Sequence, residues 1–94
     1  MDEETRGVIE KMMDESFRNE ILPDIEWLRN ELPVSSLRDL ALGHVVGHTQ
    51  AISSALVGTR QGGKFTPKDI EEIKAMIKRR LPEVMEKIER ELGR

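Results

Sequence analysis

Two histidines, His44 and His48, are the residues of this 94-residue chain whose type and spacing best suit chemistry. Residues four apart share one face of a helix, so both imidazoles can reach the same metal ion. The pair does not complete a site, because a metal such as zinc needs one or two further ligands from a facing helix or from a second copy of the chain. A divalent transition metal such as zinc is therefore one interpretation, although no cofactor is expected from the pair alone.

Two other interpretations of the histidine pair stay open. Neutral histidines can lie in a core, bonded to the backbone or to Ser and Thr side chains, and the sequence favours this reading. Alternatively, protonation of two histidines at an interface would loosen a dimer and make the pair a pH switch. The zinc-protease pattern is absent, since Val45 rather than Glu follows His44.

A glycine-rich loop is the second place where chemistry could occur. Residues 58–64 read GTRQGGK, which matches the spacing of a phosphate-binding loop. Phe65 stands where that motif needs Ser or Thr, and the loop follows a predicted helix instead of a strand, so nucleotide hydrolysis is rejected. Arg60, Lys64 and the free amides after Thr66 form a candidate anion site at a helix N-terminus, and a flexible loop with solvated bases is the alternative.

Both histidines lie in a stretch, residues 40–59, that contains no Asp, Glu, Lys or Arg, although 35% of the chain is charged. Its length suits a membrane span, but its His, Gln, Ser and Thr side chains would be costly in lipid, so no membrane association is expected. The sequence begins with MDEETRG, which is acidic where a signal peptide is cationic, and it contains no cysteine. These features predict a cytoplasmic protein.

The elements that position these residues are predicted to be helices, which makes the fold all-α: a small helical bundle of three long segments in one domain. The first segment, about residues 3–32, repeats apolar residues at helical spacing, and it either kinks at Pro23 or stops before it and restarts. The second, about 36–58, begins at Ser36 and ends at Gly58.

The third segment, about residues 66–92, has the clearest start. Thr66 is the predicted N-cap, Pro67 the first helical residue, and Asp69 closes the capping box. The apolar repeat keeps its phase through Pro82, which predicts one helix kinked at that proline.

The central segment contains a ridge of small residues that recur every fourth position: Gly43, Gly47, Ala51 and Ala55. Small residues at this spacing let another helix approach closely. A helical projection places the two histidines within a wide apolar arc, and the opposite side is polar but uncharged. The apolar arc comprises Leu37, Leu40, Ala41, Ala51, Ile52 and Ala55, and the polar side Thr49, Gln50, Ser53 and Ser54. A helix without a charged face is surrounded, so the sequence predicts a homodimer.

The same stretch has some features of a DNA-binding helix-turn-helix, with Gly47 at the turn. The supposed recognition helix carries no Arg or Lys, so only Arg60, Lys64 and the KRR run at 78–80 could contact phosphates. The basic residues of the last segment also alternate with acids, as on a solvated helix, so nucleic acid is not the expected partner.

No arrangement of nucleophile, base and acid is recognisable, so the chain is not expected to be an enzyme. The function predicted is a non-enzymatic, homodimeric interaction or regulatory module, whose partner is a second copy or another protein. The alternatives are a helix-turn-helix regulator and a metal protein that uses His44 and His48.

Overall fold

The computed structural model describes residues 1–93, which form four α-helices and one short 3₁₀-helix. The elements are α1 (Glu3–Ser16), α2 (Leu22–Ile25), η1 (Glu26–Asn30), α3 (Leu37–Arg60) and α4 (Pro67–Leu92). No strand occurs in this range, so the prediction of an all-α protein is confirmed. Within it, no helix has the length and apolar character that crossing a membrane requires.

The first predicted segment is divided into three pieces. α1 begins at the N-cap Asp2, whose carboxylate accepts a hydrogen bond of 2.7 Å from the Thr5 amide. α1 ends at Ser16, well before Pro23, and the chain becomes helical again at Leu22, with Pro23 in the first turn of α2. Proline cannot donate a backbone hydrogen bond, and its ring collides with the carbonyl four residues earlier. The helix therefore stops before the proline and a new one starts around it, at Leu22, as in one of the two alternatives.

The longest segments, α3 and α4, begin where their capping residues predict. The Ser36 hydroxyl accepts a hydrogen bond from the Asp39 amide at the start of α3, and Thr66 and Asp69 form a complete capping box at the start of α4. Gly58 does not end α3, which continues to Arg60. A glycine inside a helix costs only about 1 kcal/mol, and here the left-handed residues that turn the chain are Gly62 and Gly63.

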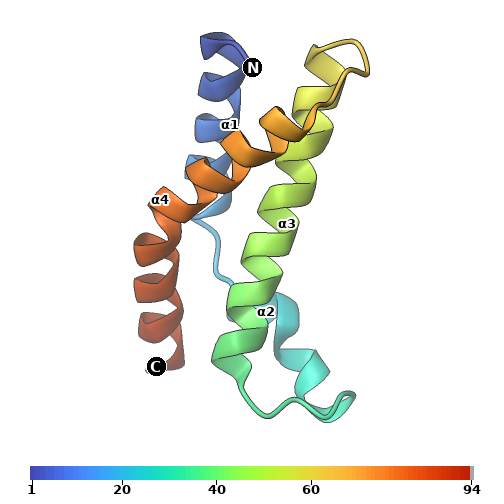
Figure 1. Ribbon diagram of the computed structural model, residues 1–94. Coiled ribbons are helices and arrows are strands. Elements are labelled where there is room, and N and C mark those ends of the chain that lie inside the picture. The colour runs from blue at the N-terminus through green and yellow to red at the C-terminus, as the bar shows by residue number, and fades with distance from the viewer. Residues whose placement is uncertain (94) are drawn as a thin grey trace.

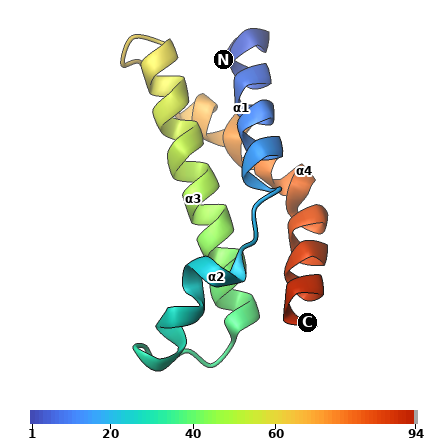
Figure 2. The same ribbon diagram turned by 180° about the vertical axis from the view of Figure 1, so that it is seen from behind.

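α4 is one helix that contains Pro82, and Figure 1 shows it bending along its length, as predicted. The two halves of α4 cover different partners. One core cluster joins α1, the end of α3 and the first half of α4, and comprises Ile9, Met13, Val57, Ile73, Met76 and Ile77. The other joins α2, the start of α3 and the second half of α4, and comprises Ile21, Leu22, Ile25, Ala41, Val84 and Ile88. Figure 2 shows from behind how α1 and α2 follow one another along α3.

The face of α3 that packs against the core differs from the predicted one. Its buried residues are Ala41, Thr49, Ser53 and Val57, whereas Ala51 and Ala55 are exposed. Large apolar residues of α3 also lie outside the predicted arc, among them Leu42, Val46 and Val57, so the projection gave that arc only a small advantage. The small side chains of Thr49 and Ser53 face the core instead, and most of the large apolar groups in the core come from the other helices.

Candidate functional site

The two histidines lie on α3 beside a pocket of about 210 Å³. Their ring centroids are 5.9 Å apart and the ring planes make an angle of 21°, so the imidazoles stack. Both side chains are exposed. The interpretation of His44 and His48 as core histidines is therefore wrong within the single chain, because the buried face of α3 is turned away from them.

The pocket is formed where the end of α1, the start of α2 and the middle of α4 meet α3. Apolar side chains and carboxylates both line it: Phe17, Ile21, Val45 and Val84 are apolar, and Glu20, Asp24 and Glu83 are acidic. Lys87 also lines it, but its ammonium group donates to the backbone carbonyls of Phe17 and Asn19. The Lys87 amine thus fixes the segment that follows α1. The histidine pair lies beside a pocket with both apolar and acidic walls.

Thr49 is the buried polar residue of this pocket. Its side chain is 1% exposed, and its hydroxyl finds no hydrogen-bond partner among residues 1–93. A buried hydroxyl without a partner costs about 1–3 kcal/mol. The pocket therefore contains a polar group that a bound molecule could satisfy.

The single chain does not bring together enough ligands to form a metal site. Across the part of the chain that the structure describes, no three His, Cys, Asp or Glu side chains converge closely enough to hold a metal ion. The two imidazoles remain neighbours on one helix, and further ligands would have to come from elsewhere.

The small-residue ridge lies on the outside of the molecule. Gly43, Gly47, Ala51 and Ala55 are all exposed. A methyl group added at either glycine would have no atom within 4 Å. The ridge is therefore not used for packing within the chain.

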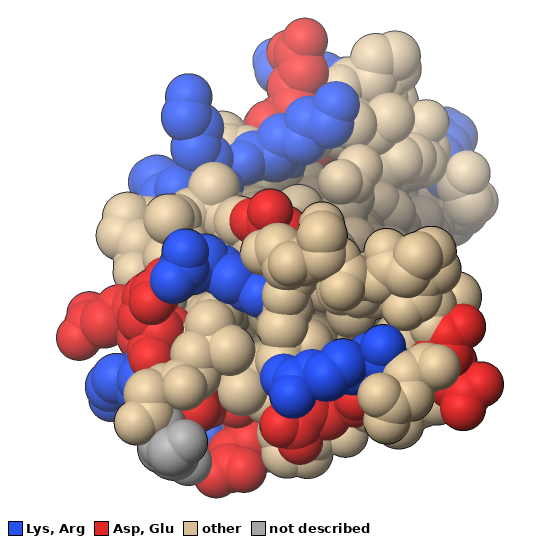
Figure 3. All heavy atoms as spheres, turned by 90° about the horizontal axis from the view of Figure 1, so that it is seen from below, with Lys and Arg blue, Asp and Glu red and all other residues tan. Residues whose placement is uncertain are grey.

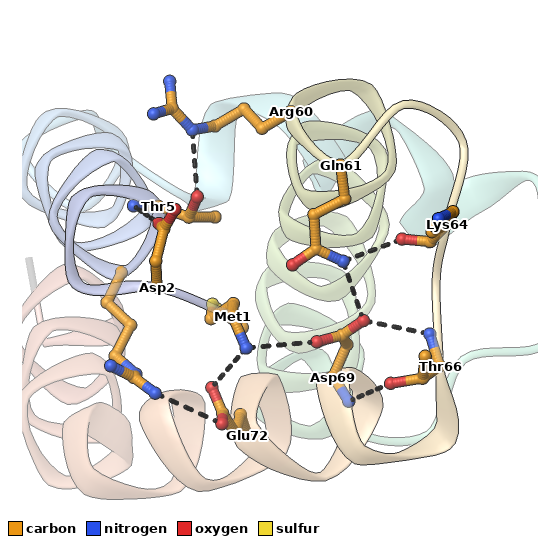
Figure 4. Close-up of polar contacts among 10 residues, drawn as sticks. Met1, Asp2, Thr5, Arg60, Gln61, Lys64, Thr66, Asp69 and Glu72 are labelled. Atoms are coloured by element: carbon orange, nitrogen blue, oxygen red, sulfur yellow. Dashed lines mark hydrogen bonds and ion pairs between the residues drawn. The ribbon is translucent and has the colours of Figure 1, made fainter.

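Two residues of the predicted anion site, Arg60 and Thr66, use their donor groups within the protein (Figure 4). Arg60 donates to the Thr5 hydroxyl at 3.0 Å and pairs with Glu4 at 3.2 Å. Lys64 contributes only its backbone carbonyl, which accepts a hydrogen bond from the Gln61 side chain. The Thr66 amide donates to Asp69 at 2.9 Å. The amide at the start of α4 thus binds a carboxylate of the chain itself.

Asp69 is the centre of this polar network. Its carboxylate accepts from the Thr66 amide and from the Gln61 side chain, and the Met1 amine lies 3.4 Å from it. The hydrogen bond from the Thr66 amide, followed by that from Gln61, lowers the pKa of Asp69 to about 2 against the opposing effect of burial. The network ties the turn between α3 and α4 to the start of the chain.

Two of the three basic residues at 78–80 on α4, Arg79 and Arg80, face the acidic α1. Arg80 lies 2.8 Å from Asp14 and 3.4 Å from Glu10, and Arg79 is 3.8 Å from Glu10. Seen from below, basic and acidic side chains are interspersed on the surface (Figure 3). The opposite charges of the first and last segments thus pair within the chain.

The turn that a helix-turn-helix requires is missing. α3 runs as one helix from Leu37 to Arg60, and Gly47 lies within it. Residues 40–58 therefore form a single helix and not two helices that cross.

Glu91 is a polar residue in the core that the sequence reasoning missed. Its carboxylate accepts hydrogen bonds from the amides of Ile21 and Leu22, at 2.8 and 3.0 Å. The signal was available, because Glu91 follows Val84 by seven residues and Ile88 by three, and so lies on the apolar stripe of α4. The pocket residues from α1, α2 and α4 carried no such signal, because only the tertiary fold brings them to α3.

Comparison of the chain with models of protein families, with curated proteins and with solved structures finds no match in any of the three.

Proposed function

We propose that this protein is a non-enzymatic interaction module that forms a homodimer through the exposed ridge of α3, defined by Gly43, Gly47, Ala51 and Ala55. The observation that carries the proposal is the combination of exposure and open space along this ridge. A two-fold axis would place the same ridge of a second copy against it, which is the commonest arrangement of soluble oligomers.

The two glycines are costly for a single chain. Glycine within a helix lowers stability by about 0.5–1 kcal/mol relative to alanine. Packing inside the chain does not require either glycine, because alanine would fit at Gly43 and Gly47 without any contact. Close approach of a second helix supplies a reason for both, since the missing side chains let two backbones come together.

The lack of charged residues in the middle of α3 also supports this face as the dimer interface. No Asp, Glu, Lys or Arg occurs in residues 40–59, although one side of this part of α3 is exposed. Interface centres are depleted of charged residues relative to the rest of a protein surface. Charges appear only at the ends of α3, at Arg38 and Asp39 and again at Arg60, which suits a polar rim.

The experiment compares two glycines that are equivalent within the chain. Gly47 and Gly7 are both exposed, both lie in helices, and both have open space at the Cβ position. We expect analytical ultracentrifugation at tens of micromolar to show a dimer for the wild type and for Gly7→Leu, and a monomer for Gly47→Leu. Circular dichroism should show equal helix content in all three.

A monomeric wild type would overturn the proposal, as would a Gly47→Leu variant that dimerises as strongly as the wild type. Loss of the dimer in both variants would also count against the ridge, because Gly7 lies on a different helix.

Metal binding at the interface is a second candidate, favoured by the position of the histidines. His44 and His48 are exposed and stacked on the same helix as the ridge. A two-fold axis near the ridge would bring two such pairs toward one another, which would supply four nitrogen ligands for an ion such as zinc. Isothermal titration of the untagged protein with zinc tests this, with His48→Gln as the comparison. A stoichiometry of one zinc per two chains is expected, and no heat of binding would remove the candidate.

A further inference from the structure

We infer that the pocket beside His44 and His48 is a binding site for a small organic cation: a primary amine attached to an apolar body. All of its lining residues belong to one chain, so the inference does not depend on dimerisation. Nothing in the proposed interaction function requires this pocket.

The walls of the pocket determine the apolar part of the ligand. Phe17, Ile21, Val45 and Val84 offer an aromatic ring and three aliphatic side chains. The volume, about 210 Å³, is below the range of about 300–1,000 Å³ that is typical of drug-sized ligands, so a single ring or a short aliphatic chain is the suitable size.

The charged residues at the pocket determine the sign of the charge that a ligand should carry. Glu83 is already bound to Arg80 at 2.7 Å, and the Lys87 ammonium group is bound to two backbone carbonyls. The Asp24 carboxylate, in contrast, has no hydrogen-bond or ion-pair partner within residues 1–93. A third acid, Glu20, also lines the pocket. An ammonium group can therefore pair with Asp24 without displacing any existing partner.

Thr49 and the histidines supply the remaining polar contacts. The Thr49 hydroxyl is buried, unpartnered and part of the pocket lining, so it is a ready acceptor for an N–H group. Neutral imidazoles of His44 and His48 each offer one ring nitrogen that accepts a hydrogen bond. A primary ammonium group has three N–H donors, which matches a carboxylate, a hydroxyl and an imidazole.

Three probes of similar size and different charge test whether the pocket prefers a cation. Benzylamine, benzyl alcohol and benzoate share an aromatic ring, and NMR titration can follow the amide of Thr49 and the ring protons of both histidines, with EDTA present. We expect benzylamine to bind severalfold more tightly than benzyl alcohol, because a charge-assisted hydrogen bond contributes more than a neutral one even at the exposed Asp24. Benzoate should bind most weakly.

Substitutions test which residues of the pocket bind the ligand. Asp24→Asn should weaken benzylamine binding severalfold, because the Asp24 carboxylate is exposed and solvent screens its charge. The near-isosteric Thr49→Val should also weaken it severalfold. Asp39→Asn is the matched control, because Asp39 is an exposed acid on α3 outside the pocket lining, and it should leave the affinity unchanged. Circular dichroism establishes that each variant is folded.

The inference is overturned if benzylamine binds no better than benzyl alcohol, or if Asp24→Asn and Asp39→Asn have equal effects. Shifts that avoid Thr49 and both histidines would equally overturn it. The monomeric Gly47→Leu variant should bind benzylamine as the wild type does, so the outcome is separate from that of the dimer experiment.

Discussion

Glu91, near the end of α4, accepts a 2.8 Å hydrogen bond from the backbone amide of Ile21, which lies 70 residues earlier in the chain. The same carboxylate oxygen accepts from Leu22 at 3.0 Å. α2 has no capping side chain of its own, so Glu91 takes the place of one. A buried acid on α4 thereby fixes where the chain becomes helical again after α1.

Replacement of Glu91 should reveal this role. Glu91→Ala leaves two amides at the start of α2 without a partner, and we expect a loss of about 1–3 kcal/mol in the free energy of unfolding, measured with urea. Glu86→Ala is the control, because Glu86 is an exposed acid on the same helix, and it should change stability by less than about 0.5 kcal/mol. Equal effects of the two substitutions would contradict the capping role.

Asp69 should contribute to the acid sensitivity of the fold. Its pKa in the folded protein is about 2, below the ordinary value of 3.8, so its stabilising effect is complete above pH 3.8 and is lost as the pH falls through 2. Asp69→Asn should therefore be less stable than the wild type at pH 6, and the difference should shrink toward pH 2. Urea midpoints between pH 2 and 6 measure this, and a constant difference would contradict the assignment.

Two adjacent serines on α3 should respond differently to alanine. Ser53 is fully buried and its hydroxyl has no partner in residues 1–93, whereas the Ser54 hydroxyl donates to the Gln50 carbonyl at 2.8 Å. Ser53→Ala removes an unsatisfied polar group, and a gain of about 1 kcal/mol is expected. Ser54→Ala removes a made hydrogen bond and should give a smaller gain or a loss. Thermal unfolding of both variants checks the order, and the reverse order would contradict it.

Arg80 should matter more than its neighbour Arg79. Arg80 is mostly buried among Glu10, Asp14 and Glu83, and its guanidinium lies 4.9 Å from the centre of the Phe17 ring. We expect Arg80→Ala to lower the free energy of unfolding by about 1–2 kcal/mol, since a partly desolvated network and a cation–π contact are both lost.

Arg79→Ala is the comparison. Its side chain is 71% exposed and its one ion pair is 3.8 Å long, so a loss below about 0.5 kcal/mol is expected. The effect of Arg80→Ala should also diminish in 1 M salt, which screens the ion pairs. Similar losses for the two arginines would show that the network around Arg80 adds nothing.

The sequence was informative at the N-terminal caps of α3 and α4 and across Pro82. The caps at Ser36 and Thr66 are specified by side chains within three residues, and both helices begin there. The unbroken apolar phase across Pro82 likewise identified one bent helix, because periodicity is a property of neighbouring residues.

The sequence was misleading about which of two faces of α3 is buried in the core. On α3 the burial of Thr49 and Ser53 is decided by how the other helices, which supply most of the core, pack against it. No window of α3 alone contains that information. For the same reason the histidine pair was expected in the core, although its stacking and its exposure depend on the side from which α1 and α2 approach.

The long-range polar contacts have a consequence for the order in which the chain assembles. The turn of residues 61–66 joins α3 to α4 directly, so closing this hairpin requires little loss of chain entropy. The contacts that attach the N-terminal third, such as Arg6 with Glu72 and Ile21 with Glu91, span 66 and 70 residues. We expect the α3–α4 hairpin to form early and to serve as the template on which α1 and α2 dock last, which would place them among the first parts to detach when the protein unfolds.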